Sequence, residues 1–254
     1  MAVCGGKGRS DLDHSRTLPM PDSPKLFMEL AMRIQQVILP VTDVEAAAAW
    51  FAEVLQLPVR GATVTIGWSR IVLQAAAQPG TGVVHLAFNV PDNRFAAAEA
   101  WLRRRVPLQR NAEGDDYFAL PGNWLSQSIY FAGPDAMILE LIGRRRLPAS
   151  SATGPFHGSE LTCVSEVGLP SDDVVALERQ IAQQFGLSPL SPSSPHFAPL
   201  GDDEGLLIVV AADRTWFPEQ TQLPGARGIE VTLSLVPAGA HLADRAQGWV
   251  LRSA

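Results

Sequence analysis

Cysteine is scarce in this sequence of 254 residues. The only two cysteines, Cys4 and Cys163, match no zinc-ligand spacing and form no disulfide framework. The sequence therefore predicts neither a disulfide-stapled secreted domain nor a cysteine-held metal. A reducing cytoplasm is the expected location.

Long apolar runs and an excess of positive charge are also absent. No stretch approaches the roughly 18 apolar residues that a membrane span needs, and the net charge is −6. We therefore expect no membrane insertion and no binding of nucleic acid. The chain also contains no glycine loop of the kind that cradles phosphate and no Ser/His/Asp or Cys/His constellation.

Hydrophobic periodicity is missing from the first part of the chain. Residues 1–31 are rich in Gly, Ser, Asp and Pro, and they lack the apolar central region of a secretory signal. We expect a disordered tail over these residues.

What the rest of the chain does contain is a repeat. The segments Gln36–Val44, His85–Asp92 and Glu166–Val174 each read as an apolar strand, a Pro/Asp turn and the start of an amphipathic helix. Further short strands follow each helix. The pattern predicts an α+β fold of tandem β-α-β-β-β modules that form open, curled mixed sheets.

The repeats also suggest a division of the chain. Residues 32–147 are expected to hold two complete modules, 148–158 a Ser/Gly/Pro-rich linker, and 159–254 a second pair. The fourth module has almost no room for a helix after its first strand at 228–236. The second pair is therefore expected to be partly eroded.

Strand periodicity singles out two polar residues. In the strand at 83–90 one face is wholly apolar, while the other carries His85, Ala87 and Asn89. Glu140 interrupts an apolar strand, which costs several kcal/mol unless the carboxylate is paired or bound to metal. A hydrogen-bonded structural histidine, and a Glu140 paired with Arg33 or Arg70, remain open alternatives.

Three motifs carry a family resemblance. They are Gln36-Val-Ile-Leu-Pro-Val-Thr-Asp43, His85-Leu-Ala-Phe-Asn-Val-Pro91 and Ile129-Tyr-Phe-Ala-Gly-Pro-Asp-Ala-Met-Ile-Leu-Glu140. Together they resemble the vicinal oxygen chelate superfamily of glyoxalase I, bleomycin-resistance proteins and extradiol dioxygenases, and most closely a two-part bacterial subgroup. In that superfamily paired modules curl around a metal ion or a small ligand.

The resemblance implies a site inside the first pair of modules. The implied metal ligands are Gln36, His85 and Glu140, which would hold Zn, Mn, Fe or Ni, and Glu140 would also be catalytic. The implied pocket residues are Gln74, Asn89, Trp124, Gln127 and Phe131. Glu166 and Glu230, which occupy related positions in the second pair, are expected to be structural, and the run Arg144–Arg146 is expected to be solvated.

Three classes of function follow. The first is a metal-dependent enzyme acting on a small molecule with vicinal oxygens. Because the implied metal ligands include only one histidine, glyoxalase, isomerase or lyase chemistry is favoured over ring-cleaving dioxygenase chemistry. The second is a metal-free protein that binds a small molecule, and the third is a degenerate scaffold. A monomer or a homodimer is expected.

Overall fold

A computed structural model describes residues 32–76 and 82–254. The predicted tail, with Cys4, lies outside the described residues. Each module is named by its place in the sequence, and the bounds of the elements follow in chain order. They are β1 Arg33–Val41, α1 Val44–Glu53, β2 Val59–Arg60, β3 Thr63–Ile66 and β4 Ser69–Ala75 in module 1; β5 His85–Val90, α2 Phe95–Arg103, β6 Phe118–Leu120, β7 Ser126–Ala132 and β8 Ile138–Arg144 in module 2; β9 Val164–Ser171, α3 Val174–Phe185, β10 Phe197–Gly201 and β11 Leu206–Ala211 in module 3; and β12 Glu230–Ser234, β13 His241–Asp244 and β14 Trp249–Ser253 in module 4.

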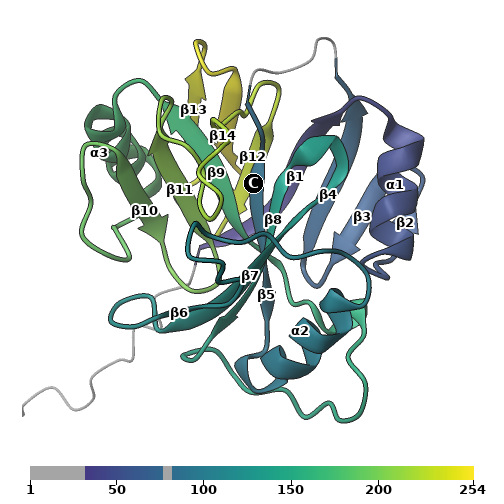
Figure 1. The fold of residues 1–254 in the computed structure, drawn as a ribbon. Coiled ribbons are helices and arrows are strands. Elements are labelled where there is room, and N and C mark those ends of the chain that lie inside the picture. Colours follow the sequence, from purple (N-terminus) through teal and green to yellow (C-terminus); the bar gives the residue numbers. More distant parts are fainter. Residues whose placement is uncertain (1–31, 77–81) are drawn as a thin grey trace, which may run out of the picture.

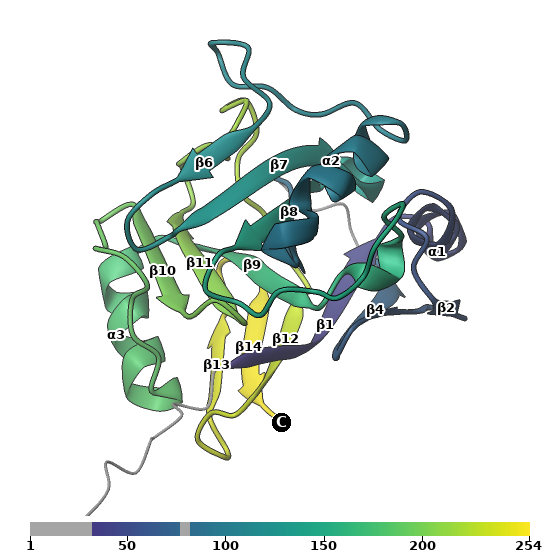
Figure 2. The same cartoon turned by 90° about the horizontal axis from the view of Figure 1, so that it is seen from below.

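The strands form two curled mixed sheets (Figures 1 and 2). Sheet 1 has the order β13-β14-β12-β1-β4-β3-β2, and sheet 2 has the order β10-β11-β9-β5-β8-β7-β6. In every module the first strand lies parallel to the last, as in the pairs β1–β4, β5–β8, β9–β11 and β12–β14. This recurring connection confirms the predicted fold of repeated modules.

The modules combine across the two halves of the sequence. In sheet 1 the first strand of module 1 pairs antiparallel with the first strand of module 4, and in sheet 2 the same pairing joins modules 2 and 3. The sequence units 32–147 and 159–254 therefore do not coincide with the two sheets. Any site built on sheet 2 must draw residues from modules 2 and 3.

Modules 3 and 4 have fewer helices and strands than modules 1 and 2, as expected. Module 3 has two strands after its helix, and module 4 has no helix among the described residues, with only β13 between β12 and β14. The Pro/Asp turns act as helix starts in modules 1 and 3. Asp43 Oδ1 accepts from Ala46 N, and Asp173 Oδ1 accepts from Ala176 N, both at 2.9 Å.

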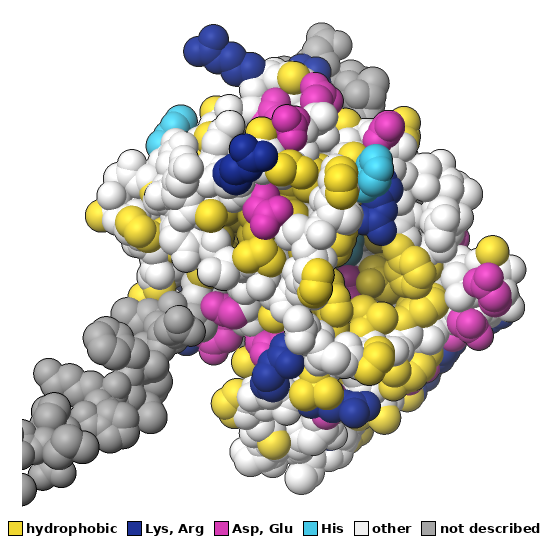
Figure 3. Space-filling model, turned by 90° about the vertical axis from the view of Figure 1, so that its left-hand side faces the viewer, with side chains coloured by type: hydrophobic (Ala, Val, Ile, Leu, Met, Phe, Trp, Pro, Cys, Tyr) yellow, Lys and Arg dark blue, Asp and Glu magenta, His cyan; other side chains and the backbone are white. Residues whose placement is uncertain are grey.

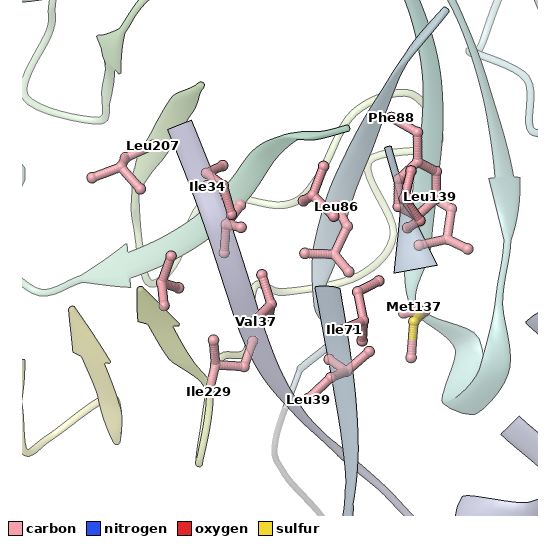
Figure 4. Packing of buried hydrophobic residues seen from close by; sticks show 14 of the residues in the cluster. Ile34, Val37, Leu39, Ile71, Leu86, Phe88, Met137, Leu139, Leu207 and Ile229 are labelled. Atoms are coloured by element: carbon pink, nitrogen blue, oxygen red, sulfur yellow. The ribbon is translucent and has the colours of Figure 1, made fainter. Parts of the chain in front are cut away.

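One continuous apolar core joins the two sheets and the three helices. Figure 4 shows side chains of β1 and β4, such as Val37 and Ile71, close to those of β5 and β8, such as Leu86 and Leu139. Ser69 links the sheets inside this core, because its hydroxyl donates to Ile34 O (2.6 Å) and accepts from Val164 N (3.0 Å). The opposite face of sheet 2 is left free to form a site.

No helix in the described part of the chain is long and apolar enough to cross a membrane.

Candidate metal and ligand site

Three ionisable side chains meet on the concave face of sheet 2. Ala87 on β5 lies between Glu140 on β8 and Glu166 on β9, because it is the register partner of both. His85 precedes Ala87 by two residues and so shares its face. Small Ala87 leaves room above it, and one ligand atom from each of His85, Glu140 and Glu166 lies within 4.8 Å of the others. We call these three residues the His85 cluster.

The histidine ring is oriented by the backbone. His85 Nδ1 lies 3.2 Å from Ile138 O, which can only accept a hydrogen bond, so Nδ1 carries a proton in this contact. The Nε2 lone pair then faces the two carboxylates, with Glu140 Oε2 and Glu166 Oε2 each 3.6 Å away. All three side chains are at least nine-tenths buried.

A buried arginine orients the second carboxylate. Arg144 at the end of β8 is fully buried, and its Nη2 donates to Glu166 Oε1. Its Nη1 lies 3.5 Å from Asp203 Oδ1. Because Arg144 engages Oε1, the other oxygen of Glu166 remains available to face His85. The expectation that Arg144 is solvated is therefore wrong, since Glu166, Asp203 and the Trp124 ring lie around its guanidinium.

Burial and like charge shift the ionisation of this region. Desolvation, followed by repulsion from Glu166, raises the pKa of Glu140 well above its usual range, while Arg144 acts in the opposite direction. Desolvation and the two carboxylates also raise the pKa of Tyr130 well above its ordinary value. Glu140 therefore holds a proton more readily than an exposed glutamate does, and the Tyr130 phenol stays neutral.

The arrangement fits a divalent cation. Two ligand atoms about 2.1 Å from one tetrahedral ion are roughly 3.4 Å apart, so the separations of 3.6 Å lie near that value. A cation would also offset the repulsion between Glu140 and Glu166. One imidazole and two carboxylates suit Zn, Mn, Fe or Ni, with water in the remaining positions.

A cavity of about 260 Å³ opens above the cluster and is lined mainly by apolar and aromatic side chains. On the face shown in Figure 3, hydrophobic side chains surround a hollow in the surface. The lining residues are His85, Phe118, Leu120, Trp124, Tyr130, Glu140, Ile142, Glu166, Phe197, Ile208, Arg214, Thr215, Trp216 and Phe217. They come from modules 2 and 3 and from the segment after β11.

Trp216 fixes one wall of this cavity against the histidine. Its ring centroid lies 5.1 Å from that of His85, and its Nε1 donates to Val83 O at 3.0 Å. Gly168 on β9 allows this packing, because a Cβ there would lie 2.7 Å from the Trp216 ring and 3.2 Å from His85 Cβ.

We predict that Gly168→Ala displaces the indole and destabilises the protein by roughly 1–3 kcal/mol, because the added methyl overpacks a filled site. Thermal unfolding measures the loss. In the Trp216→Phe background, Gly168→Ala should cost less stability than it does in the wild type, since the smaller ring leaves space for the methyl group. Equal losses with and without the indole would contradict this account of the wall.

The structure separates the three expected metal ligands. His85 and Glu140 lie together, but Gln36 is on β1 in sheet 1, where it pairs with Arg70 and Thr232. The expected convergence with Gln36 is therefore wrong, because β1 and β5 belong to different sheets. Glu166, expected to be structural, is the third member of the cluster.

The other expected residues are scattered. Trp124 lines the cavity, whereas Gln74 is exposed on β4 in sheet 1. Asn89 is buried on the cluster's face of β5 and donates to Asp203 O (2.7 Å), but it does not line the cavity. Gln127 and Phe131 also lie outside the lining.

The strand period explains the last two positions. Gln127 Nε2 donates to Asp92 Oδ1 (2.7 Å), and the ring of Phe131 stacks on that of Trp50 within the core. Gln127 and Phe131 share one face of β7, and Tyr130 lies on the other face and lines the cavity. Glu230 lies in sheet 1, where it pairs with Arg252 at 3.1 Å.

Several site residues were missed at the sequence level. Glu166 gave a usable signal, because it interrupts an apolar strand at the position that Gln36 occupies in module 1. Arg214 and Trp216 follow the apolar strand at 206–210 in a pattern that also resembles the two-part subgroup, but neither they nor Phe217 were assigned to the site, since the path of this irregular segment depends on the whole fold.

No family model and no curated protein matches this sequence. Two of the solved structures that match most of this chain are 15% and 16% identical to it. A glyoxalase I variant from Zea mays has a TM-score of 0.54, with 88% of this chain and 94% of that chain covered. A candidate dioxygenase from Bacillus subtilis strain 168 has a TM-score of 0.53, with 85% and 72% covered. The chain therefore shares its fold with these glyoxalase I and dioxygenase structures, which is the fold that its motifs predicted.

Proposed function

We propose that this protein is a metal-dependent enzyme that acts on a small molecule with vicinal oxygens. The observation that carries the proposal is the His85 cluster, which places one imidazole and two carboxylates at the floor of an aromatic cavity. His85, Glu140 and Glu166 would hold a divalent ion, which would supply Lewis-acid stabilisation of negative charge on the substrate's oxygens.

All three side chains of the cluster would hold the ion, and they differ in what else they do. His85 Nε2 and Glu166 Oε2 would act only as ligands, with Glu166 oriented by Arg144 through Oε1. Glu140 is also the proposed catalytic base, because its carboxylate lines the cavity, where it can take a proton from a carbon beside the bound oxygens and return it to a neighbouring atom. Tyr130 stays protonated, and its hydroxyl can donate a hydrogen bond to the ligand. The aromatic walls exclude water.

The donor set favours isomerase or lyase chemistry of the glyoxalase type over ring-cleaving dioxygenase chemistry. Non-haem iron oxygenases use two histidines and one carboxylate, whereas the cluster has one histidine and two carboxylates. A metal-free binding protein is the second candidate. Its support is the mainly apolar lining of the cavity and the partial compensation of the carboxylates by Arg144.

The proposal predicts that the purified protein binds about one equivalent of Zn, Mn, Fe or Ni. It should then isomerise or cleave an α-hydroxycarbonyl or thiohemiacetal compound without consuming oxygen. Elemental analysis and calorimetric titration measure the metal, and an oxygen electrode separates the two chemistries. Oxygen uptake with a catechol would reverse the preference between reactions. Ligand binding without metal at millimolar concentrations would favour the metal-free candidate.

A further inference from the structure

The outer part of the cavity carries one cation that the metal site does not use. Arg214 lies on the cavity lining, and its guanidinium carbon is 4.8 Å from the centre of the Phe197 ring. Arg144 and Arg146 are paired with Glu166 and Asp203. Arg214, in contrast, has no carboxylate within salt-bridge distance among residues 32–76 and 82–254, and desolvation alone lowers its pKa. Although Arg214 is an exposed residue, its guanidinium packs on the Phe197 ring, and it is a positive charge without a counter-ion in the described chain.

The position of Arg214 is at the opposite end of the cavity from the carboxylates. On β11, Leu206 is the register partner of Glu166, whereas Val210 is the partner of Phe197, whose ring lies under the guanidinium. Four residues of strand separate these two levels, on the order of 13 Å. A ligand that reaches both must be elongated.

The walls between the two ends are aromatic. Phe217 packs edge-on against Phe118 and Tyr130, with ring centroids 4.6 and 5.3 Å away, while Trp216 forms a separate contact with His85. Such rings favour a flat apolar body by stacking and edge contacts. They offer few partners for a peptide-like ligand with several charges, because each buried polar group would need its own hydrogen bond.

We propose that the cavity takes an aromatic monoanion, whose ring lies between the aromatic walls and whose acidic group is bound by Arg214. Only the placement of the ligand's other end, as an oxygen pair at the His85 cluster, rests on the proposed function. Because the side chains of Glu166 and Arg214 extend into the cavity from these two backbone levels, an aromatic ring with a short acidic side chain can reach both ends although it is shorter than the separation of the levels. Charge complementarity, rather than the metal, then selects acids over the corresponding alcohols.

A matched pair of probes tests the anion subsite. The probes are 3-(3,4-dihydroxyphenyl)propionate and the alcohol 3-(3,4-dihydroxyphenyl)propan-1-ol, titrated by calorimetry into the metal-loaded full chain. We expect the acid to bind about threefold to fivefold more tightly, because a charge pair at an exposed arginine contributes up to about 1 kcal/mol. Arg214→Gln should remove this preference while leaving the affinity for the alcohol within about threefold. Arg245→Gln, at an exposed arginine outside the cavity lining, is the control and should keep the preference.

The outcomes separate this inference from the proposed function. A preference for the acid that survives Arg214→Gln would overturn the subsite, as would a failure of both probes to bind the wild type. Repeating the titration with 3-phenylpropionate and 3-phenylpropanol in Glu140→Gln removes the oxygen pair and the proposed metal site together. If Glu140→Gln still prefers the acid, the Arg214 subsite is supported even if the protein binds no metal. If the wild type binds metal but does not prefer the acid, the subsite is contradicted while the proposed function stands.

Discussion

Glu140→Gln is expected to abolish divalent metal binding and, at the same time, to stabilise the metal-free protein. The amide keeps the shape of the carboxylate but removes its charge, so a cation loses one of its two anionic ligands. The same change removes the repulsion from Glu166 and the cost of burying the charge. We expect metal affinity to fall by more than about 100-fold, since even residues outside the metal ligands contribute 10–100-fold.

The gain in stability of the metal-free protein should be about 1 kcal/mol or more, which raises Tm by roughly 2–4 °C for a chain of this size. Thermal unfolding with and without chelator measures it. Glu230→Gln is the matched control, because Glu230 lies in sheet 1 and pairs with Arg252. It should change neither quantity. Unchanged metal content in Glu140→Gln would remove the His85 cluster as the metal site.

The pH dependence follows from the direction of the Glu140 shift. The folded protein holds the Glu140 proton more tightly than the unfolded chain does, so this group favours folding below the unfolded pKa of about 4.3. That contribution is lost as pH rises towards the raised folded pKa. Metal binding displaces the proton, so metal affinity should rise with pH over the same range, by at most tenfold per pH unit for one proton. In Glu140→Gln, the part of the pH dependence of the unfolding free energy that Glu140 causes should be absent.

Local sequence patterns predicted the modules but not their partners. A strand, a Pro/Asp turn and a helix are set by neighbouring residues, as the caps at Asp43 and Asp173 show. The pairing of β5 with β9 rather than β1 depends on contacts between residues far apart in the chain. His85 and Glu140 were predictable because both belong to module 2, whereas the choice between Gln36 and Glu166 required the pairing of modules.

The faces of strands were predictable where the apolar pattern is complete. His85 and Asn89 share a face, as their alternation with Leu86 and Phe88 indicated. Strand β7 gave a weaker signal, because Ser126 and Ser128 are polar yet buried, and Tyr130 is as bulky as the core residue Phe131. Sequence alone therefore could not assign which of its aromatic residues lines the cavity.

Arg144→Met is expected to cost about 3–5 kcal/mol of folding stability, because it leaves the buried carboxylate of Glu166 without its cation. Urea unfolding, monitored for a change in midpoint at constant slope, measures this loss. Arg146→Met is the matched control. Arg146 contacts the same Asp203 as Arg144 does, but its side chain is 39% exposed, so its pair should contribute only about 0–1 kcal/mol.

A double variant assigns the loss to the buried pair rather than to the removal of a large side chain. Glu166→Gln removes the charge that Arg144 compensates, so Arg144→Met should cost much less in the Glu166→Gln background than in the wild type. If Arg144→Met costs the same in both backgrounds, the arginine acts by filling space. If Arg144→Met costs as little stability as Arg146→Met, then Arg144 does not compensate the buried charge of Glu166. The orientation of Glu166 Oε2 towards His85 must then have another cause.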